Sequence, residues 1–190
     1  MAATSNGFWT TSVAKDPKRG FRFRIRFDGG DSGLSGVLWY AKKADKPQIS
    51  FTEASHNYLN HTYYWPARTE WNEVSVTFVD PVEPDVCGSL TQLVTAAGYK
   101  IPAGGAFPDA DFASVSKAKS VGALGDVAIE HIDEDGIALE TWTLNNGWVK
   151  ELTFGDLDYG SDDLTEVTMK IRYDWASVDV RGFGGKIFTL

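Results

Sequence analysis

The fold is decided by the stretch IALETWTLNNGWVKELTF, residues 137–154, in which two runs of alternating apolar and polar side chains flank a short polar turn. Alternation with a period of two places every second side chain on one face and is typical of a β-strand. The turn, Asn145-Asn146-Gly147, supplies residues that tolerate positive φ angles. We therefore expect strands at 137–144 and 147–154, paired as a hairpin.

Similar runs lie on both sides of this stretch. Residues 126–134 predict a strand that Asp135-Gly136 turns back, and residues 164–175 predict the last strand. Near the N-terminus, FRFRIRF at 21–27 alternates strictly and predicts a strand with its apolar side chains inward and three arginines outward. Further strands are expected at 37–43, 61–65 and 72–80, with a short one at 49–51, an irregular polar stretch at 54–60 and Pro66 as a stop.

One helix is predicted from Val86 to Ala97, with Asp85 as its N-cap and Gly98 as its C-terminal stop. Residues 1–20 are interpreted as an arm, 99–122 as a long loop and 177–190 as a C-terminal tail. The expected fold is mainly β: a single domain over 1–190, built as a β-sandwich or half-barrel of about seven or eight strands with one flanking helix.

Composition excludes several classes of protein. The 190 residues are 43% hydrophobic and carry a net charge of −8, which indicates one globular domain and argues against a general nucleic-acid binder. A single cysteine, Cys87, excludes a disulfide scaffold, and no apolar run is long enough to span a membrane. Residues 1–20 lack the apolar core of a signal peptide, so we expect a protein made in a reducing cytoplasm.

Charge is distributed unevenly along the chain. Residues 1–50 hold nine basic and four acidic side chains, whereas residues 126–179 hold three basic and fourteen acidic ones. A solvated acidic face is one interpretation. The other is an acidic surface that repels polyanions, together with a basic surface that meets an acidic neighbour.

No motif for catalysis, cofactor binding or metal binding is present in the sequence. His56 and His61 have no metal-ligand spacing, and neither a phosphate loop nor a nucleophile elbow occurs. The aspartates between 156 and 163 lack the order of a calcium loop. The sequence therefore predicts no enzyme, no cofactor and no metal. One alternative is a sugar-stacking platform, for which the candidate aromatics are Trp39, Tyr40, Tyr58, Tyr63, Tyr64, Trp65 and Trp71.

The second half of the chain carries a denser set of motifs. Residues 139–150 contain an E-x-W-x-L strand, a turn and a W-[IV]-K strand; FGDLDY at 154–159 and SDDL at 161–164 follow, and 169–176 close with R-Y-D-W. In the first half, YWPARTEW at 64–71 has a P-x-R-x-x-W pattern before a strand. This set resembles the tail tube protein of contractile-tailed bacteriophages of the T-even type, over residues 21–97 and 121–176. The motif residues are Trp142, Trp148, Tyr159, Arg172, Tyr173, Asp174 and Trp175.

The resemblance implies a structural virion protein without catalytic residues. Its hexameric rings would stack into a hollow tube with a continuous β-barrel lumen, assembled in the bacterial host cytoplasm. Its partners would be its own copies, the sheath, the tape-measure protein and the baseplate and terminator proteins, while DNA passes through without specific binding. The alternatives are a tube-initiator or baseplate ring, the tube of a phage-derived injection device and, more distantly, a carbohydrate-binding β-sandwich module.

Two surfaces are predicted for such a tube subunit. Residues 45–62 are expected to form the ring-to-ring stacking loop, as the corresponding connection does in the resembling family, with Phe51, His56, Tyr58 and Leu59 as its anchors. We expect Arg22, Arg24 and Arg26 to lie outside the lumen, paired with carboxylates. The candidates for lumen-facing acidic residues are Asp126, Glu130, Glu134, Glu140, Glu151, Glu166 and Asp174.

Overall fold

The structure of the protein is a computed structural model that describes residues 17–28, 30, 40–83, 85–101, 114–182 and 185–188. Most of the predicted arm, residues 102–113 of the predicted loop at 99–122 and Trp39 lie outside the described residues.

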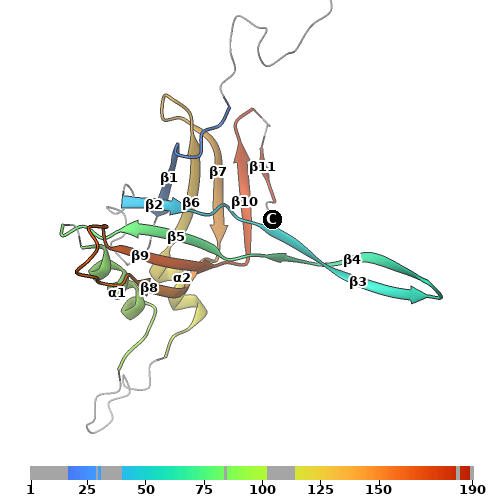
Figure 1. Cartoon of the computed structure of the whole chain (residues 1–190), viewed down its shortest axis with the longest axis horizontal. Coiled ribbons are helices and arrows are strands. Elements are labelled where there is room, and N and C mark those ends of the chain that lie inside the picture. The colour runs from blue at the N-terminus through green and yellow to red at the C-terminus, as the bar shows by residue number, and fades with distance from the viewer. Residues whose placement is uncertain are drawn as a thin grey trace, which may run out of the picture.

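Two antiparallel sheets and a long two-stranded ribbon make up the β structure (Figure 1). The first sheet has the order β1 (Phe23–Asp28), β6 (Asp126–Ile132), β7 (Ala138–Asn145), β10 (Trp175–Val180) and β11 (Lys186–Ile187). The second sheet has the order β2 (Ala41–Ala44), β5 (Val74–Val79), β9 (Glu166–Arg172) and β8 (Trp148–Phe154). The ribbon, β3 (Ile49–Tyr58) and β4 (His61–Trp71), extends away from the body, and α1 (Val86–Ala96) and α2 (Lys117–Leu124) lie beside the second sheet.

The core lies between the two sheets and under the helices. On β5, Val74, Val76 and Phe78 are buried while the residues between them are half-buried, as strict alternation requires. The same alternation buries Ile25 and Phe27 on β1, whereas Phe21 precedes the strand and is exposed, contrary to the predicted inward position. The largest fully buried side chains are Phe78, Ile25, Leu90, Leu93, Leu124, Leu144, Met169, Ile171, Val74 and Val76.

The prediction that 137–144 and 147–154 form a hairpin is wrong. β7 pairs with β6 and β10, whereas β8 pairs with β9 in the other sheet. The turn at 145–147 is therefore a corner at which the chain leaves one layer and enters the other. Asn146 takes a positive φ of 54° there, and Gly147 is buried where an added Cβ would meet Ile171 and Leu124. A turn that looks like a hairpin turn in sequence also serves as a layer crossing, because both need positive φ.

Three further predictions need correction. Strand β3 runs through the stretch 54–58, which was expected to be irregular, and β4 continues past Pro66 to Trp71. Part of the predicted loop at 99–122 forms α2, capped by Ser116, whose side chain accepts from the Lys119 amide. The predicted tail contains most of β10 and all of β11, so the described residues hold eleven strands and two helices rather than seven or eight strands and one helix.

The predicted ends of α1 are confirmed. The Asp85 side chain accepts a hydrogen bond from the Gly88 amide, and Gly98, with φ 101°, follows the C-cap. The backbone after α2 lies close to the backbone after β1: a Cβ on Gly125 would lie 2.4 Å from the Gly30 nitrogen. Neither described helix is long and apolar enough to cross a membrane.

Candidate assembly surface

Nearly every residue of the ribbon is exposed. Its two strands pair with each other from Ile49–Trp71 at the root to Tyr58–His61 at the tip, and neither strand pairs with another described strand. Figure 1 shows the ribbon projecting from the body. Isolated two-stranded ribbons are marginally stable in water, so a ribbon of this length is an element that a partner would cover.

One face of the ribbon is aromatic. Register and alternation place His56 opposite Tyr63 and Tyr58 opposite His61, with Trp65 on the same face. The His61 ring meets Tyr63 edge-on at 4.7 Å, and the Tyr63 and Trp65 centroids lie 6.1 Å apart. Tyr63 is 47% exposed and Trp65 50% exposed. We call this the aromatic face: His56, Tyr58, His61, Tyr63 and Trp65.

The opposite face of the distal ribbon is more polar. Asn57 accepts a hydrogen bond of 2.8 Å from the Thr62 hydroxyl, and Ser55 lies opposite Tyr64. The ribbon is thus amphipathic, although both faces are exposed. Of the sequence-predicted anchors, His56 and Tyr58 lie on the aromatic face, Phe51 lies nearer the root and Leu59 lies at the tip.

The tip holds an unusual residue. Leu59 has a positive φ of 50° and is 88% exposed. Left-handed backbone costs an L-residue about 1–2 kcal/mol, and two-residue hairpin loops normally use glycine, asparagine or aspartate there. A strained, exposed leucine presents an apolar group at the far end of the ribbon.

A β-bulge between Phe51 and Glu53 explains why Pro66 does not end β4. Proline cannot donate to the ladder and is tolerated at bulges. Next to it, the Thr52 hydroxyl accepts the Arg68 amide at 2.9 Å and so replaces a backbone partner. The sequence rule that proline stops a strand fails here because the bulge removes the need for its N–H.

The predicted lumen carboxylates fall into two groups. Glu130 and Glu140 are 4% and 9% exposed and are paired with lysine or arginine of the same chain. Because these two carboxylates are buried, they do not have the exposure that the predicted lumen position requires. Asp126, Glu134, Glu151 and Asp174 are exposed and Glu166 is partly exposed. Glu151 and Glu166 lie on the outer face of the second sheet, where Lys170 and Lys42 bind them. Hydrogen bonding to Lys170 lowers the pKa of Glu151.

Arg24 and Arg26 on β1, and Arg22 just before it, are each bound to carboxylates of their own chain. Arg22 bonds Glu134 at 3.2 Å, Arg24 bonds Glu130, and Arg26 lies 3.2 Å from Asp28 and 3.6 Å from Glu130. The expected pairing of these arginines is therefore present within one subunit. Arg24 and Arg26 belong to the first sheet, whereas the pairs Lys42–Glu166 and Lys170–Glu151 belong to the second.

Most of the phage-like motif residues gather at one corner, where the chain crosses twice between the sheets. The chain crosses from β7 to β8 at 145–147 and from β9 to β10 at 173–174. Asp174 joins the two crossings, because its carboxylate accepts from the Asn146 amide at 2.8 Å and its backbone N–H donates to Asn145 at 3.1 Å. Hydrogen bonding from Lys117 lowers the pKa of Asp174. Trp142, Trp148, Arg172, Tyr173 and Trp175 lie on the strands or turns at this corner, whereas Tyr159 lies in the exposed loop 155–165.

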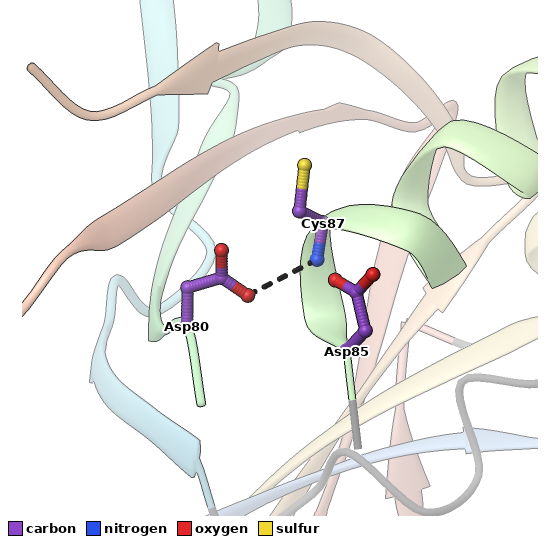
Figure 2. Close-up of side chains that lie close together, drawn as sticks. All are labelled: Asp80, Asp85 and Cys87. Carbon is purple, nitrogen blue, oxygen red and sulfur yellow. Dashed lines mark hydrogen bonds between the residues drawn. The ribbon is translucent and has the colours of Figure 1, made fainter. Parts of the chain in front are cut away.

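A cluster of Asp80, Asp85 and Cys87 at the start of α1 serves as a helix cap. Figure 2 shows both carboxylates beside the first turn of the helix, where Asp80 accepts the Cys87 amide at 3.2 Å. Asp85 accepts the Gly88 amide at 2.8 Å. Burial raises the pKa of the Cys87 thiol, which disfavours the thiolate that metals bind. These contacts account for the cluster, and we assign no metal to it.

The arrangement as a whole is the fold of tube proteins of contractile injection systems. A chain of the sheath–tube complex of PVC, an extracellular contractile injection system, superposes with a TM-score of 0.60 and 14% identity over 86% of this chain and 92% of that one. The tube-terminating cap of the anti-feeding prophage superposes with a TM-score of 0.62 and 15% identity over 95% and 99%.

The terminator of the PVC sheath and tube has the same fold, with a TM-score of 0.62 and 14% identity over 88% of this chain and all of that one. No protein-family profile matches the chain. No curated protein sequence matches it either. The likeness is therefore one of fold, reached through sequences that share few residues.

Proposed function

We propose that the protein is a structural subunit of a contractile tail tube, in which six copies close a ring and rings stack into a hollow tube. The observation that carries the proposal is a four-stranded sheet with two open edges beside a projecting amphipathic ribbon. The fold shared with injection-system tube and terminator chains supports it. In this role the protein has no catalytic residue.

Ring closure uses the edges of the second sheet. Among the described residues, β2 and β8 each have a strand partner on one side only. Open edges invite pairing with another chain, and natural proteins cover them or close them into barrels. Six copies of a four-stranded sheet supply 24 strands, enough for a barrel with an aqueous channel. The tube wall is then the second sheet.

The channel in this arrangement is lined by the outer face of the second sheet. Thr77 and Thr168 share a hydrogen bond of 3.2 Å there, and Lys42 and Lys170 are already bound by Glu166 and Glu151. DNA binds a protein when free cationic side chains neutralise its phosphates and release their counterions. Lysines that already have carboxylate partners therefore bind DNA weakly. The arginines of β1 lie on the other sheet, and six copies at −8 give a ring of about −48.

Stacking uses the ribbon. Its aromatic face and its apolar tip would pack against a subunit of the next ring, which removes aromatic surface from water. More specifically, we propose a bacteriophage tail that conducts DNA, with sheath, tape-measure, baseplate and terminator proteins as partners. The alternative, the tube of an injection device with another cargo, would have the same geometry.

The test is assembly of the purified chain. Sedimentation over a wide concentration range and negative-stain microscopy should give rings of six subunits and tubes. Deleting residues 53–66, the distal ribbon, should leave rings and abolish tubes. A protein that stays monomeric at every concentration overturns the proposal, and long tubes from the shortened protein overturn the role of the ribbon.

A second candidate is a terminating or initiating ring. The cap of the anti-feeding prophage superposes over 95% of this chain with a TM-score of 0.62, and the chain of the sheath–tube complex over 86% with a TM-score of 0.60. Such a protein would form single rings that do not polymerise and would be present in one or two rings per particle. Tubes from the purified chain exclude it, whereas rings alone at every concentration favour it.

A further inference from the structure

A buried carboxylate holds the root of the ribbon. Glu140, on β7, is 9% exposed, and its Oε1 accepts a hydrogen bond from Lys46, which lies between β2 and β3. Its other oxygen, Oε2, accepts from Lys18 at 2.6 Å, in the chain before β1. His131 of β6 completes the cluster, with Nδ1 3.3 Å from Lys46 Nζ and Nε2 2.9 Å from the Arg19 carbonyl.

Stability alone does not explain this cluster. Burial by itself raises the pKa of the Glu140 carboxyl, but the hydrogen bonds from Lys18 and Lys46 outweigh it and lower the pKa to about 2. Replacing a buried ion pair by apolar groups of similar size is often neutral or stabilising, because the charges no longer have to be stripped of water. What an apolar replacement loses is direction, since a charge-assisted hydrogen bond fixes where its donor lies.

The direction in which the ribbon leaves the body matters because a small rotation at its root produces a large displacement at its tip. The ten residues of β3 span about 33 Å at 3.3 Å per residue. A swing of about 10° at the root then moves the tip by about 6 Å, more than the 4.8 Å spacing of neighbouring strands. Other described contacts at the root are backbone bonds from Asn72 to Gln48 and from Asp45 to Ser75, the packing of Trp71 on Tyr173 and Phe188, and the burial of Pro47.

We propose that Glu140 is the positioning residue of the ribbon: by holding Lys46 it sets the direction in which the aromatic face is presented to the next subunit. This inference rests on the proposed function for the meaning of that direction. The direction itself is a property of the single chain and is measured without assembly.

The experiment is a distance measurement between two spin labels. Cys87→Ser removes the native thiol, and Ser55→Cys on the ribbon and Thr153→Cys on β8 accept nitroxides at exposed positions. Labelled chains are diluted into excess unlabelled protein so that pulsed electron–electron resonance reads distances within one chain. The parent should give one narrow distance distribution, and Glu140→Leu should broaden it by about twofold or more, since small root rotations move the label by several ångströms.

Two lysine variants separate positioning from general stabilisation. Lys46→Met and Lys18→Met each remove one hydrogen bond to the same carboxylate, and the two lysine side chains are similarly exposed. Lys46→Met should broaden the distribution and Lys18→Met should not, because only Lys46 belongs to the ribbon root. Glu151→Leu, which removes an ion pair on the second sheet, is the control and should leave the distribution unchanged. If Glu140→Leu does not fold, the comparison of the distance distributions of Lys46→Met and Lys18→Met decides the proposal.

An unchanged distribution in folded Lys46→Met, or equal broadening in both lysine variants, overturns the assignment. In parallel, Lys46→Met should keep rings and lose long tubes. If the parent forms neither rings nor tubes, the proposed function fails while the distance result still decides the role of Glu140.

Discussion

The burial and the pairing of Glu140 are set by its tertiary neighbours and not by its local sequence. In the sequence it is one of many acidic side chains in a negative segment, and the natural expectation was an exposed carboxylate facing a channel. In the fold it is buried between two lysines from segments more than ninety positions away. The alternation on β7 places it on the same face as Trp142 and Leu144, at the edge of the core. Nothing local to its sequence identifies those partners.

Glu140 makes a definite contribution to pH dependence. Its pKa is lowered from 4.5 to about 2 in the folded protein, so its stabilising contribution is complete above about pH 4.5 and is lost as the pH falls toward 2. At 1.36 kcal/mol per unit the contribution is at most about 3 kcal/mol, and screening around the half-exposed lysines reduces it. Urea unfolding from pH 6 to pH 2 should show the stability gap between the parent and Glu140→Gln closing as the pH falls. A gap that is constant with pH contradicts the folded-state pairing.

Among the elements, α1 follows its sequence closely because its end signals are local. The aspartate at its start and the glycine at its end act on neighbouring backbone groups and need no distant partner. The ribbon differs: its strands contain proline, histidine and asparagine, and they become continuous only by pairing with each other through a bulge.

The cap of α1 gives a quantitative expectation. Asp85→Ala removes the acceptor for the Gly88 amide and should lower the free energy of unfolding by about 1 kcal/mol. Asp156→Ala, in the exposed loop after β8, should change it by less than about 0.5 kcal/mol. Chemical denaturation of both variants checks the difference, and equal effects would mean that the cap contributes no more than a surface charge.

The two faces of the ribbon provide a matched pair of variants. Tyr63→Thr/Trp65→Thr strips the aromatic face while keeping residues that favour β structure, and should abolish tubes while costing the single subunit about 1 kcal/mol or less. Tyr64→Thr removes an aromatic that is more exposed, at 63%, from the opposite face and should leave tubes intact. Microscopy and sedimentation distinguish the two variants. Loss of tubes in Tyr64→Thr alone would mean that the opposite face, and not the aromatic face, makes the stacking contact.

Across the whole molecule, the chain passes twice between the layers at one corner, and these crossings decide which strands become neighbours. They bring Asp174 to Asn146 and place β8 at the open edge of the second sheet. The proposed ring closure depends on that edge, so the corner connects the sequence motif to assembly.

Assembly of like-charged subunits should depend on salt. Each chain carries −8, and the screening length falls from about 30 Å at 0.01 M salt to about 10 Å at 0.1 M. The polymerised fraction measured by sedimentation should therefore rise over this range. Asp156→Asn/Asp162→Asn, which neutralises two exposed carboxylates, should weaken the dependence. Polymer that dissolves as salt increases would instead indicate ion pairs across the interfaces as the main attraction.

The sequence by itself determined what depends on near neighbours: the β-rich class, the start of a strand at Asp126, the phase of β5, both ends of α1 and the turn at Gly136. Alternation, capping and positive φ are read over a few residues, so a single sequence suffices for them. Only the tertiary structure decided that 145–147 is a corner, that β3 and β4 form one long ribbon, and that Glu140 joins Lys18 to Lys46. The physical reason is that these features are contacts between segments distant in sequence, whose free energy comes from burial and charge pairing that no local pattern records.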